Sequence, residues 1–249
     1  MPRYKLIISY DGTNYAGWQV QETGLAIQPL VQKSLQTVLR HPIDLTASGR
    51  TDAGVHALGQ TAHFDTPVPF EPTRLRTSLN ALLPKDIRIC HIQPVEADFH
   101  ARYRALSKIY HYHLHLDPVA DPFARLYRHR ITGPCDLDLI KKGIPHFLGV
   151  HNFVSFANQA DRGSASRDPI RNLLRLDLLP QPGGVRLEFE ADGFLYKMVR
   201  NIVGTLLDVA ASRIDPNEIP SILAAQDRRR AGTAAPPHGL CLCQVNYAG

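Results

Sequence analysis

The hydrophobic pattern of this chain switches between two periods, and the order of the switches is the strongest constraint on its fold. Residues 4–10 alternate apolar and polar side chains, as a half-buried strand does, and stop at the turn sequence Asp11-Gly12. A helical spacing of apolar residues follows over residues 27–39 and ends before Pro42. Two strand patterns, a second helical pattern beginning at Pro72 and a further strand pattern complete the order β-α-β-β-α-β.

The second half of the chain has the same order of patterns, although we find no repeat in the letters themselves. The expected strands cover residues 4–10, 43–47, 59–66, 87–95, 106–116, 170–179, 185–191 and 240–247, and the expected helices cover residues 27–39, 72–83, 136–148 and 194–211. This order predicts an α+β fold of two tandem split-βαβ (ferredoxin-like) units, residues 1–104 and 105–249. The units would form a mostly antiparallel sheet with helices on one side. Gly143 and Pro145 should kink or shorten the third helix.

Charge and composition narrow the class of partner. The chain has 249 residues, of which 44% are hydrophobic, so it is long enough to build a substantial core. Its net charge of +5 favours a polyanion such as nucleic acid. The first apolar run is too short for a signal peptide, and no segment reaches the length of a membrane span. We therefore expect a cytoplasmic protein with no membrane partner, whose four cysteines are thiols.

One carboxylate stands out in the polar segment GRTDAGVHA, residues 49–57. Asp52 lies between two expected strands, and Gly49 and Gly54 permit tight backbone and close approach of a ligand. An accessible aspartate is ionised at neutral pH, which suits a nucleophile or a general base. The alternative is an Asx-type turn in which Asp52 only caps backbone amides.

Two further segments supply candidate partners. Strict alternation in SKIYHYHLHLD, residues 107–117, places Tyr110 and Tyr112 on one strand face, where an aromatic ring can stack on a base. Arg200 lies in an apolar helical segment and needs a partner, because a desolvated, unpaired charge costs several kcal/mol. Asp52 is the partner we favour.

Five segments together resemble one family over nearly the whole chain. They are YDGTNYAGWQVQ, GRTDAGVHA, KIYHY, YKMVRNIVG and GLCLCQV, in the order and at about the spacing of the tRNA pseudouridine synthase A family. The resemblance implies the pseudouridine synthase fold, with Asp52 as catalytic aspartate and Tyr110 packed against the target base. It also implies that Arg200 pairs with the aspartate and that Arg50 holds the substrate nucleotide out of its stack. The family often has an arginine where this chain has His111.

The activity implied by the resemblance is isomerisation of uridine to pseudouridine in the anticodon stem-loop of tRNA, at positions 38–40. The aspartate would act as nucleophile on a flipped base. The reaction oxidises nothing and loses nothing, so neither a redox cofactor nor a metal is expected. The family also implies a homodimer with tRNA as its partner.

Two other functions compete with this interpretation. A zinc enzyme would use His111, His113 and His115, which share one strand face, with His56, His63 and Asp65 as further ligands. A non-catalytic RNA-binding module is the second alternative, because tandem split-βαβ units resemble RNA-recognition domains. The sequence does not indicate a role for two polar loops, residues 157–168 and 227–239; the second has three consecutive arginines that either contact phosphate or are solvated.

Overall fold

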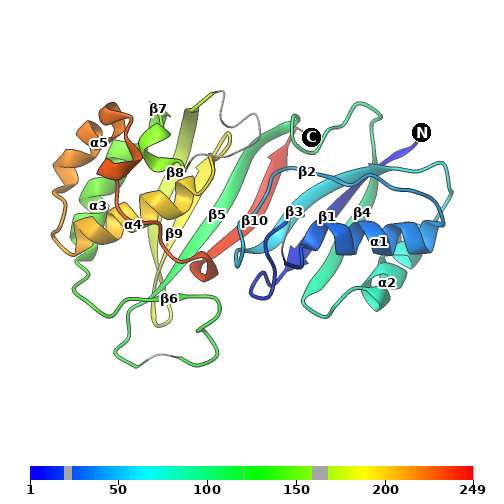
Figure 1. The fold of residues 1–249 in the computed structure, drawn as a ribbon, viewed down its shortest axis with the longest axis horizontal. Helices are drawn as coiled ribbons and strands as arrows, with labels where there is room; N and C mark the ends of the chain where they lie inside the picture. The colour runs from blue at the N-terminus through cyan, green and yellow to red at the C-terminus, as the bar shows by residue number, and fades with distance from the viewer. Residues whose placement is uncertain (20–23, 120, 159–167, 249) are drawn as a thin grey trace. The chain divides into compact units, whose positions relative to one another are not determined.

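The chain folds into two compact units. The structure is a computed structural model that describes residues 1–19, 24–119, 121–158 and 168–248. Residues 1–106 with 241–249 form unit 1, and residues 107–240 form unit 2 (Figure 1). Most of the polar loop 157–168, and the end of the YDGTNYAGWQVQ segment, lie outside the described residues.

The strands of unit 1 are mostly antiparallel. Its elements are β1 (Arg3–Tyr10), α1 (Ile27–Leu39), β2 (Thr46–Ala47), β3 (His56–Asp65), α2 (Pro72–Leu82), β4 (Ile87–Val95) and β10 (Leu240–Tyr247). Strand β1 lies between β3 and β4 and is antiparallel to both. The alternation expected at its sequence is present: Leu6, Ile8 and Tyr10 are buried, with less buried residues between them. Helix α1 contacts α2, and α2 contacts β4.

Strand β3 begins three residues earlier than its apolar pattern indicated. Its first residues pair in parallel with β10, His56 with Cys241 and Ala57 with Leu242. A Cβ at Gly59 would lie 2.3 Å from the carbonyl oxygen of Cys243, so only glycine allows this approach of the two backbones. Strand β3 therefore begins early because it pairs with β10, which comes from the other end of the sequence.

The main strands of unit 2 lie in the order β5-β9-β8-β7, with each neighbouring pair antiparallel. Its elements are β5 (Ala105–His115), β6 (His129–Arg130), α3 (Leu137–Gly143), η1 (Ile144–Phe147), β7 (Gly149–Asn152), η2 (Val154–Phe156), β8 (Ile170–Gln181), β9 (Gly184–Ala191), α4 (Met198–Ala210), η4 (Pro216–Glu218), α5 (Ile219–Ala225), η5 (Arg228–Arg230) and η6 (Pro237–Gly239). Strand β6 pairs in parallel with β5. The sequence patterns did not predict β7 or α5.

Helix α3 is shortened at Gly143 and Pro145, as predicted, whereas α4 is shorter than predicted. The helix expected over residues 136–148 ends as an α-helix at Gly143 and continues as the 3₁₀ turn η1, which contains Pro145. A Cβ at Gly143 would lie 2.9 Å from Cδ1 of Ile219, so this glycine allows α5 to pack closely. Helix α4 begins at Met198 rather than at residue 194, because Lys197 has a left-handed backbone with φ of 60°.

The fold class is thus α+β with a mostly antiparallel sheet, as expected. No helix in the described parts of the chain has both the length and the apolar character needed to span a membrane.

Candidate active site

Asp52 lies in unit 1 on a tight turn between β2 and β3. The N–H of Val55 donates to the carbonyl oxygen of Asp52 at 3.2 Å, and Gly54, third in this turn, has φ of 75°. This conformation favours glycine and accounts for the Asp-Ala-Gly sequence. The Asp52 side chain is half-buried and Arg50, in the same loop, is exposed. The structure therefore places Asp52 and Arg50 on one short loop.

A second segment, residues 10–18, supports this loop from unit 1. Trp18 donates its backbone N–H to the carbonyl oxygen of Thr51 at 3.1 Å, and Gly54 donates to Tyr15 O at 3.2 Å. A Cβ at Gly12 would lie 2.0 Å from Val55 O, and one at Gly17 would lie 2.5 Å from Thr51 O. The two glycines of the YDGTNYAGW segment therefore allow its backbone to lie directly against the loop that carries Asp52.

Hydrogen bonds from buried polar side chains also hold the Asp52 loop in place. The hydroxyls of Tyr10 and Thr51 are 2.8 Å apart, and both side chains are buried. Ser48 donates to Gln60 Oε1 at 2.8 Å, and Gln60 donates to Gly49 O at 3.0 Å. Burial raises the pKa of Tyr10, so its phenol stays protonated. A loop with its buried polar groups satisfied in this way is held in one conformation.

Sequence reasoning named the YDGTNYAGW segment only as part of the family resemblance. The sequence patterns end a strand at Tyr10 and place a turn at Asp11-Gly12, but they do not indicate that Tyr10, Gly12, Gly17 and Trp18 support the Asp52 loop. The two glycines were the available signal, because glycine inside a short aromatic segment often marks a close approach of backbone.

Tyr110 lies in unit 2, on the inner face of β5. Its side chain is 9% exposed, and its ring packs edge-to-face on Phe194, with ring centroids 5.1 Å apart. Tyr112, two residues on, is fully buried, as expected for a residue on the same strand face. Both tyrosines thus belong to the aromatic packing of unit 2, and Tyr110 is the more accessible of the two.

Arg200 is held to the segment that precedes β10. Its Nε donates to Ala235 O at 2.7 Å, and the N–H of Ala235 donates to Arg200 O at 2.9 Å. The Tyr112 hydroxyl donates to Pro236 O at 2.8 Å. Burial raises the pKa of Tyr112, and the nearby Arg200 charge acts against this. Helix α4 and strand β5 therefore bind consecutive carbonyl groups of one segment.

Residues that follow Arg200 in α4 also bond to the chain that precedes β10. Asn201 Oδ1 accepts from Arg228 at 2.8 Å, and Thr205 Oγ1 accepts from the N–H of Gly232 at 2.9 Å. A Cβ at Gly204 would lie only 1.7 Å from Thr233 O. These positions share one face of α4, which gives the spacing of the segment YKMVRNIVGT a structural explanation.

The three arginines of loop 227–239 differ in their surroundings. Arg228 bonds to Asn201, and burial lowers the pKa of its guanidinium. Arg229 is paired with Asp227 at 2.8 Å, and this pairing lowers the pKa of Asp227 to about 2. Arg230 is exposed. Arg228 thus has a structural role. Contact with phosphate and simple solvation are alternatives for the exposed Arg229 and Arg230.

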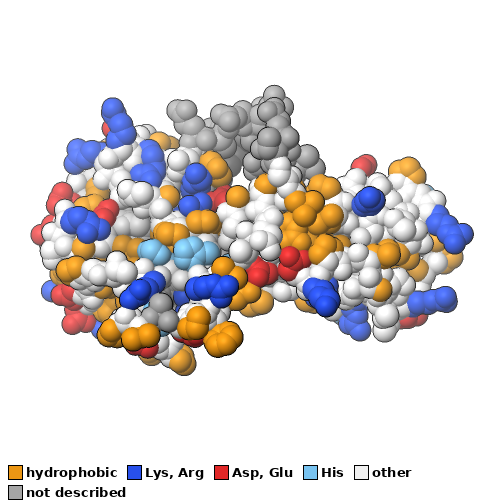
Figure 2. Space-filling model, turned by 60° about the horizontal axis from the view of Figure 1, so that its bottom comes forward, with side chains coloured by type: hydrophobic (Ala, Val, Ile, Leu, Met, Phe, Trp, Pro, Cys, Tyr) orange, Lys and Arg blue, Asp and Glu red, His pale blue; other side chains and the backbone are white. Residues whose placement is uncertain are grey.

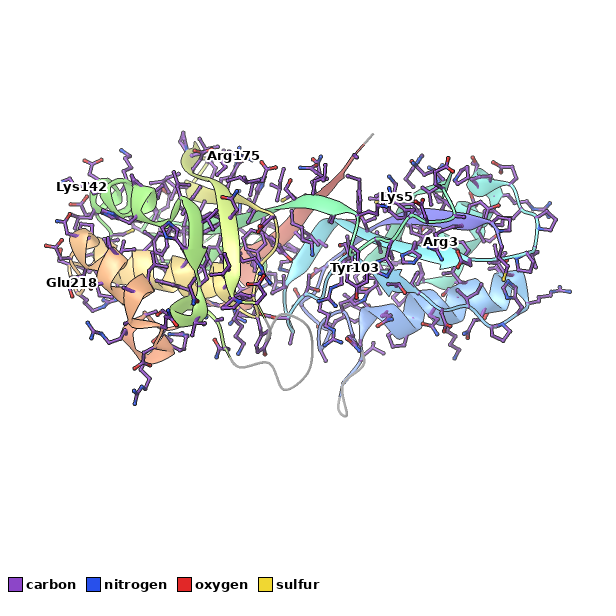
Figure 3. All side chains as sticks on the ribbon, turned by 90° about the horizontal axis from the view of Figure 1, so that it is seen from above. Arg3, Lys5, Tyr103, Lys142, Arg175 and Glu218 are labelled. Carbon is purple, nitrogen blue, oxygen red and sulfur yellow. The ribbon has the colours of Figure 1, made fainter. Side chains whose placement is uncertain are left out.

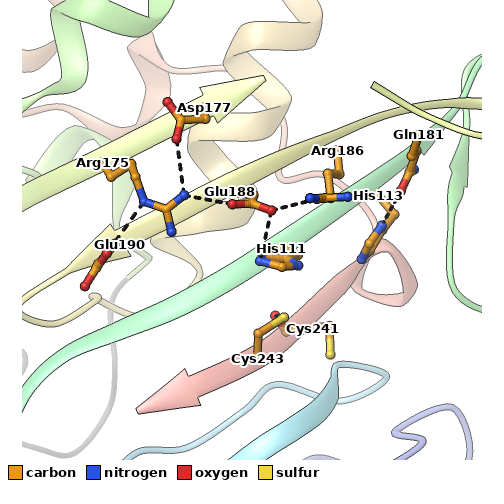
Figure 4. Close-up of polar contacts among 10 residues, drawn as sticks. All are labelled: His111, His113, Arg175, Asp177, Gln181, Arg186, Glu188, Glu190, Cys241 and Cys243. Atoms are coloured by element: carbon orange, nitrogen blue, oxygen red, sulfur yellow. Dashed lines mark hydrogen bonds and ion pairs between the residues drawn. The ribbon is translucent and has the colours of Figure 1, made fainter. Parts of the chain in front are cut away.

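The histidines proposed as zinc ligands have other neighbours (Figure 4). His111 lies 3.4 Å from Glu188 on β9, and His113 Nδ1 lies 2.9 Å from Gln181 Oε1. Glu188 also accepts from Arg175 and from Arg186 at 2.7 Å each. Burial raises the pKa of the Glu188 carboxyl, but these two arginines outweigh it and hold the pKa below its usual range.

His115, His56 and His63 also have protein partners. His115 Nε2 lies 2.9 Å from Val119 O, and the Nδ1 atoms of His56 and His63 accept from the N–H groups of Gly12 and Ala101. Asp65 is paired with Arg3. Over residues 1–19, 24–119, 121–158 and 168–248, no three His, Cys, Asp or Glu side chains are grouped as a metal site requires.

Lys and Arg side chains are visible on the faces of both units in the view of Figure 2, with acidic side chains among them. This mixture accords with the modest net charge of +5. It suits reversible association with a polyanion.

Comparison with known proteins identifies the family. A family model described as tRNA pseudouridine synthase matches residues 6–104 and 144–248. The chain is 54% identical over 245 residues to tRNA pseudouridine synthase A 1 of Protochlamydia amoebophila, covering 98% of this chain and 96% of that one. It is 43% identical to tRNA pseudouridine synthase A of Chlamydia felis (99% and 92% covered) and 41% identical to tRNA pseudouridine synthase A 1 of Bacillus cereus (99% and 99%). The chain therefore belongs to the tRNA pseudouridine synthase A family, a family of isomerases.

Proposed function

We propose that this protein converts uridine to pseudouridine in the anticodon stem-loop of tRNA, at positions 38–40, with Asp52 as the nucleophile. The observation that carries the proposal is the structure of the Asp52 loop. Its carboxylate is half-buried on a tight turn, and the loop is supported by the close backbone contacts of two glycines and by hydrogen bonds between buried polar side chains. Such a construction holds one side chain in a defined position while leaving it accessible, which is what a nucleophile requires.

The reaction breaks the bond from ribose C1′ to uracil N1 and forms a bond from C1′ to C5 of the same base. C5 loses its proton and N1 gains one, so the product is an isomer of the substrate. An ionised carboxylate can attack the nucleotide, either at the base or at the sugar, and form the covalent intermediate that separates bond breaking from bond making. Every electron pair is supplied by the nucleotide and the carboxylate.

Three further residues complete the proposal. Tyr110 packs against the target base, Arg50 holds the nucleotide out of its stack, and Arg200 pairs with Asp52. At an effective dielectric constant of about 20, two such charges about 4 Å apart attract by ~4 kcal/mol before desolvation. The Nε of Arg200 is fixed by Ala235 O, which supports a role in which a guanidinium of defined orientation faces a carboxylate.

The finer fold assignment belongs to the same proposal. In unit 1, β4, β1 and β3 lie in that order and β2 pairs with the far edge of β3. This is the strand order of a split-βαβ unit, and it supports such a unit in residues 1–104. The proposed second split-βαβ unit, residues 105–249, includes β10, whereas the compact unit 1 also contains residues 241–249. We also propose that the protein acts in the cytoplasm as a homodimer, the assembly that the family implies.

Release of tritium from tRNA labelled at C5 of uridine tests the proposed function. The unsubstituted protein should release tritium, and Asp52→Asn should release none above background while keeping its fold and its affinity for tRNA. Asp44→Asn is the matched control, because Asp44 is an exposed aspartate of the same unit. Reverse-transcription mapping of the product should place the modified uridines at positions 38–40.

The competing RNA-binding module gives a different result. A protein that only binds RNA would retain tRNA and release no tritium, with or without Asp52. If Asp52→Asn released tritium at the rate of the unsubstituted protein, the assignment of Asp52 as nucleophile would be wrong, while the family activity would stand.

A further inference from the structure

Unit 1 carries a column of aromatic rings that ends at the surface. The His63 and His100 ring centroids are 4.8 Å apart, and those of His100 and Tyr103 are 4.3 Å apart with an interplanar angle of 32°. His63 is buried, His100 is half-buried and Tyr103 is 75% exposed. The last ring therefore has one face on a histidine and is mostly exposed to solvent; Figure 3 labels Tyr103 with Arg3 and Lys5 of the same unit.

The turn that carries this column is fixed by hydrogen bonds. Arg104 donates its N–H to His100 O at 3.0 Å, which closes the turn, and Ala101 donates its N–H to His63 Nδ1 at 3.2 Å. The Tyr247 hydroxyl donates to Ala101 O at 2.7 Å. The buried Ala101 is thus bonded to β3 through its N–H and to β10 through its carbonyl oxygen. The turn that carries Tyr103 is therefore rigidly held.

Burial and neighbouring charges favour the neutral form of the His100 ring. Its Nδ1 accepts from the N–H groups of Arg102 and Tyr103 at 3.1 and 3.3 Å. Burial, and then the charges of Arg3 and Arg102, lower the pKa of His100. The support beneath Tyr103 is thus a neutral aromatic ring at physiological pH, not a cation that water would solvate.

Two cations lie near the column. The guanidinium carbon of Arg102 is 5.9 Å from the Tyr103 ring centroid. Lys5 Nζ is 5.7 Å from the ring centroid of Phe99, next in the chain to His100. An exposed aromatic ring beside positive charge matches the two surfaces of a nucleotide, its flat base and its anionic phosphate.

We propose that Tyr103, supported by His100, is a stacking platform for one unpaired base of the tRNA substrate, with Arg102 beside the adjoining phosphate. This inference rests on the proposed function for the identity of the RNA. The platform lies within unit 1 and does not include Asp52, Arg50, Tyr110 or Arg200. It positions the tRNA and takes no part in bond breaking.

Substitutions at Tyr103 separate stacking from simple apolar contact. Tyr103→Phe keeps the ring and should bind unmodified tRNA with a Kd within about twofold of the unsubstituted protein. Tyr103→Leu removes the ring and should raise the Kd about tenfold, in the range found for loss of one base stack. Because the base in question does not react, we expect KM to rise with Kd while kcat changes less than about twofold.

Phe123→Leu is the matched control, since Phe123 is an aromatic residue of unit 2 that is 87% exposed. It should leave Kd unchanged. All three variants should have the Tm of the unsubstituted protein, because each changed side chain is exposed.

The outcomes distinguish the platform from the proposed function. Equal Kd values for Tyr103→Leu and the unsubstituted protein, with normal tritium release, would overturn the platform and leave the synthase activity intact. Tyr103-dependent tRNA binding without tritium release would overturn the activity and support the platform. A protein that does not bind tRNA would overturn both, and an equal loss in Tyr103→Phe would show that the hydroxyl, not the ring, makes the contact.

Discussion

At the scale of single residues, the hydrogen bond between Tyr10 and Thr51 connects β1 to the loop that carries Asp52. We expect Tyr10→Phe and Thr51→Val each to lower the free energy of unfolding by about 1 to 2 kcal/mol, because each leaves a buried hydroxyl or its site unsatisfied. The double variant should show a coupling of about 1 kcal/mol in urea unfolding. Additive effects would mean that the bond contributes nothing specific.

The same pair bears on activity. Tyr10→Phe should lower kcat for tritium release more than it raises KM, since it loosens the loop beneath the nucleophile rather than a surface that contacts RNA. Ser9→Ala is a suitable comparison, because Ser9 also bonds to the backbone of β3, at Ala57 O, but not to this loop.

His63 should make stability depend on pH. Burial, and then the charges of Arg3 and His100, lower its pKa from 6.5 to about 4. The unfolded chain therefore binds a proton between these two values while the folded chain does not. The stabilisation is complete above about pH 6.5 and is lost as pH falls toward 4, by up to about 3 kcal/mol.

The variant His63→Gln separates the contribution of His63 to the pH dependence of stability from the contributions of the carboxylates. His63→Gln keeps an acceptor for the Ala101 N–H but does not titrate, so the fall in unfolding free energy between pH 6.5 and 4 should be smaller in this variant. Parallel pH profiles for the two proteins would contradict a neutral, buried His63.

At the scale of elements, helix α4 and the segment before β10 form one closely packed pair. Gly204→Ala should lower the free energy of unfolding by about 3 kcal/mol, because its Cβ would overlap the Thr233 carbonyl, 1.7 Å away, and backbone must move. Activity should fall with it, since the segment also fixes the Nε of Arg200.

Gly133→Ala provides the control for the α4 experiment. Gly133 lies in the same unit, and a Cβ there has no neighbour within 4 Å. Its stability in urea should match that of the unsubstituted protein within about 0.5 kcal/mol. A Gly204→Ala variant equally stable would show that the two backbones do not need this contact.

Most strands and helices could be predicted from the sequence, since each depends on the period of its own apolar residues. Strand β4 and β10 have the predicted bounds, and α1 begins and ends where its periodicity does. The shortening of α3 at Gly143 and Pro145 was also predicted. The errors have causes outside the apolar pattern: the left-handed backbone of Lys197 delays α4, and β3 is extended by pairing with β10.

At the scale of the whole molecule, we predict a homodimer, as the family implies. Light scattering coupled to size exclusion should give twice the chain mass of 27.7 kDa at micromolar concentration. A C₂ pair is the commonest assembly of identical chains. The mass of a single chain, under conditions in which the protein releases tritium, would rule the dimer out as a requirement for activity.

The sequence by itself determined the order of most elements, the α+β class and the family, because periodicity and contiguous motifs are local properties of the chain. It also placed Asp52 and Arg50 on one loop between two strands. Only the tertiary structure decided what lies behind that loop and which carbonyl binds the Nε of Arg200. Each of these depends on contacts between residues distant in sequence, such as Tyr10 with Thr51 and Arg200 with Ala235, and no local pattern specifies which distant groups meet.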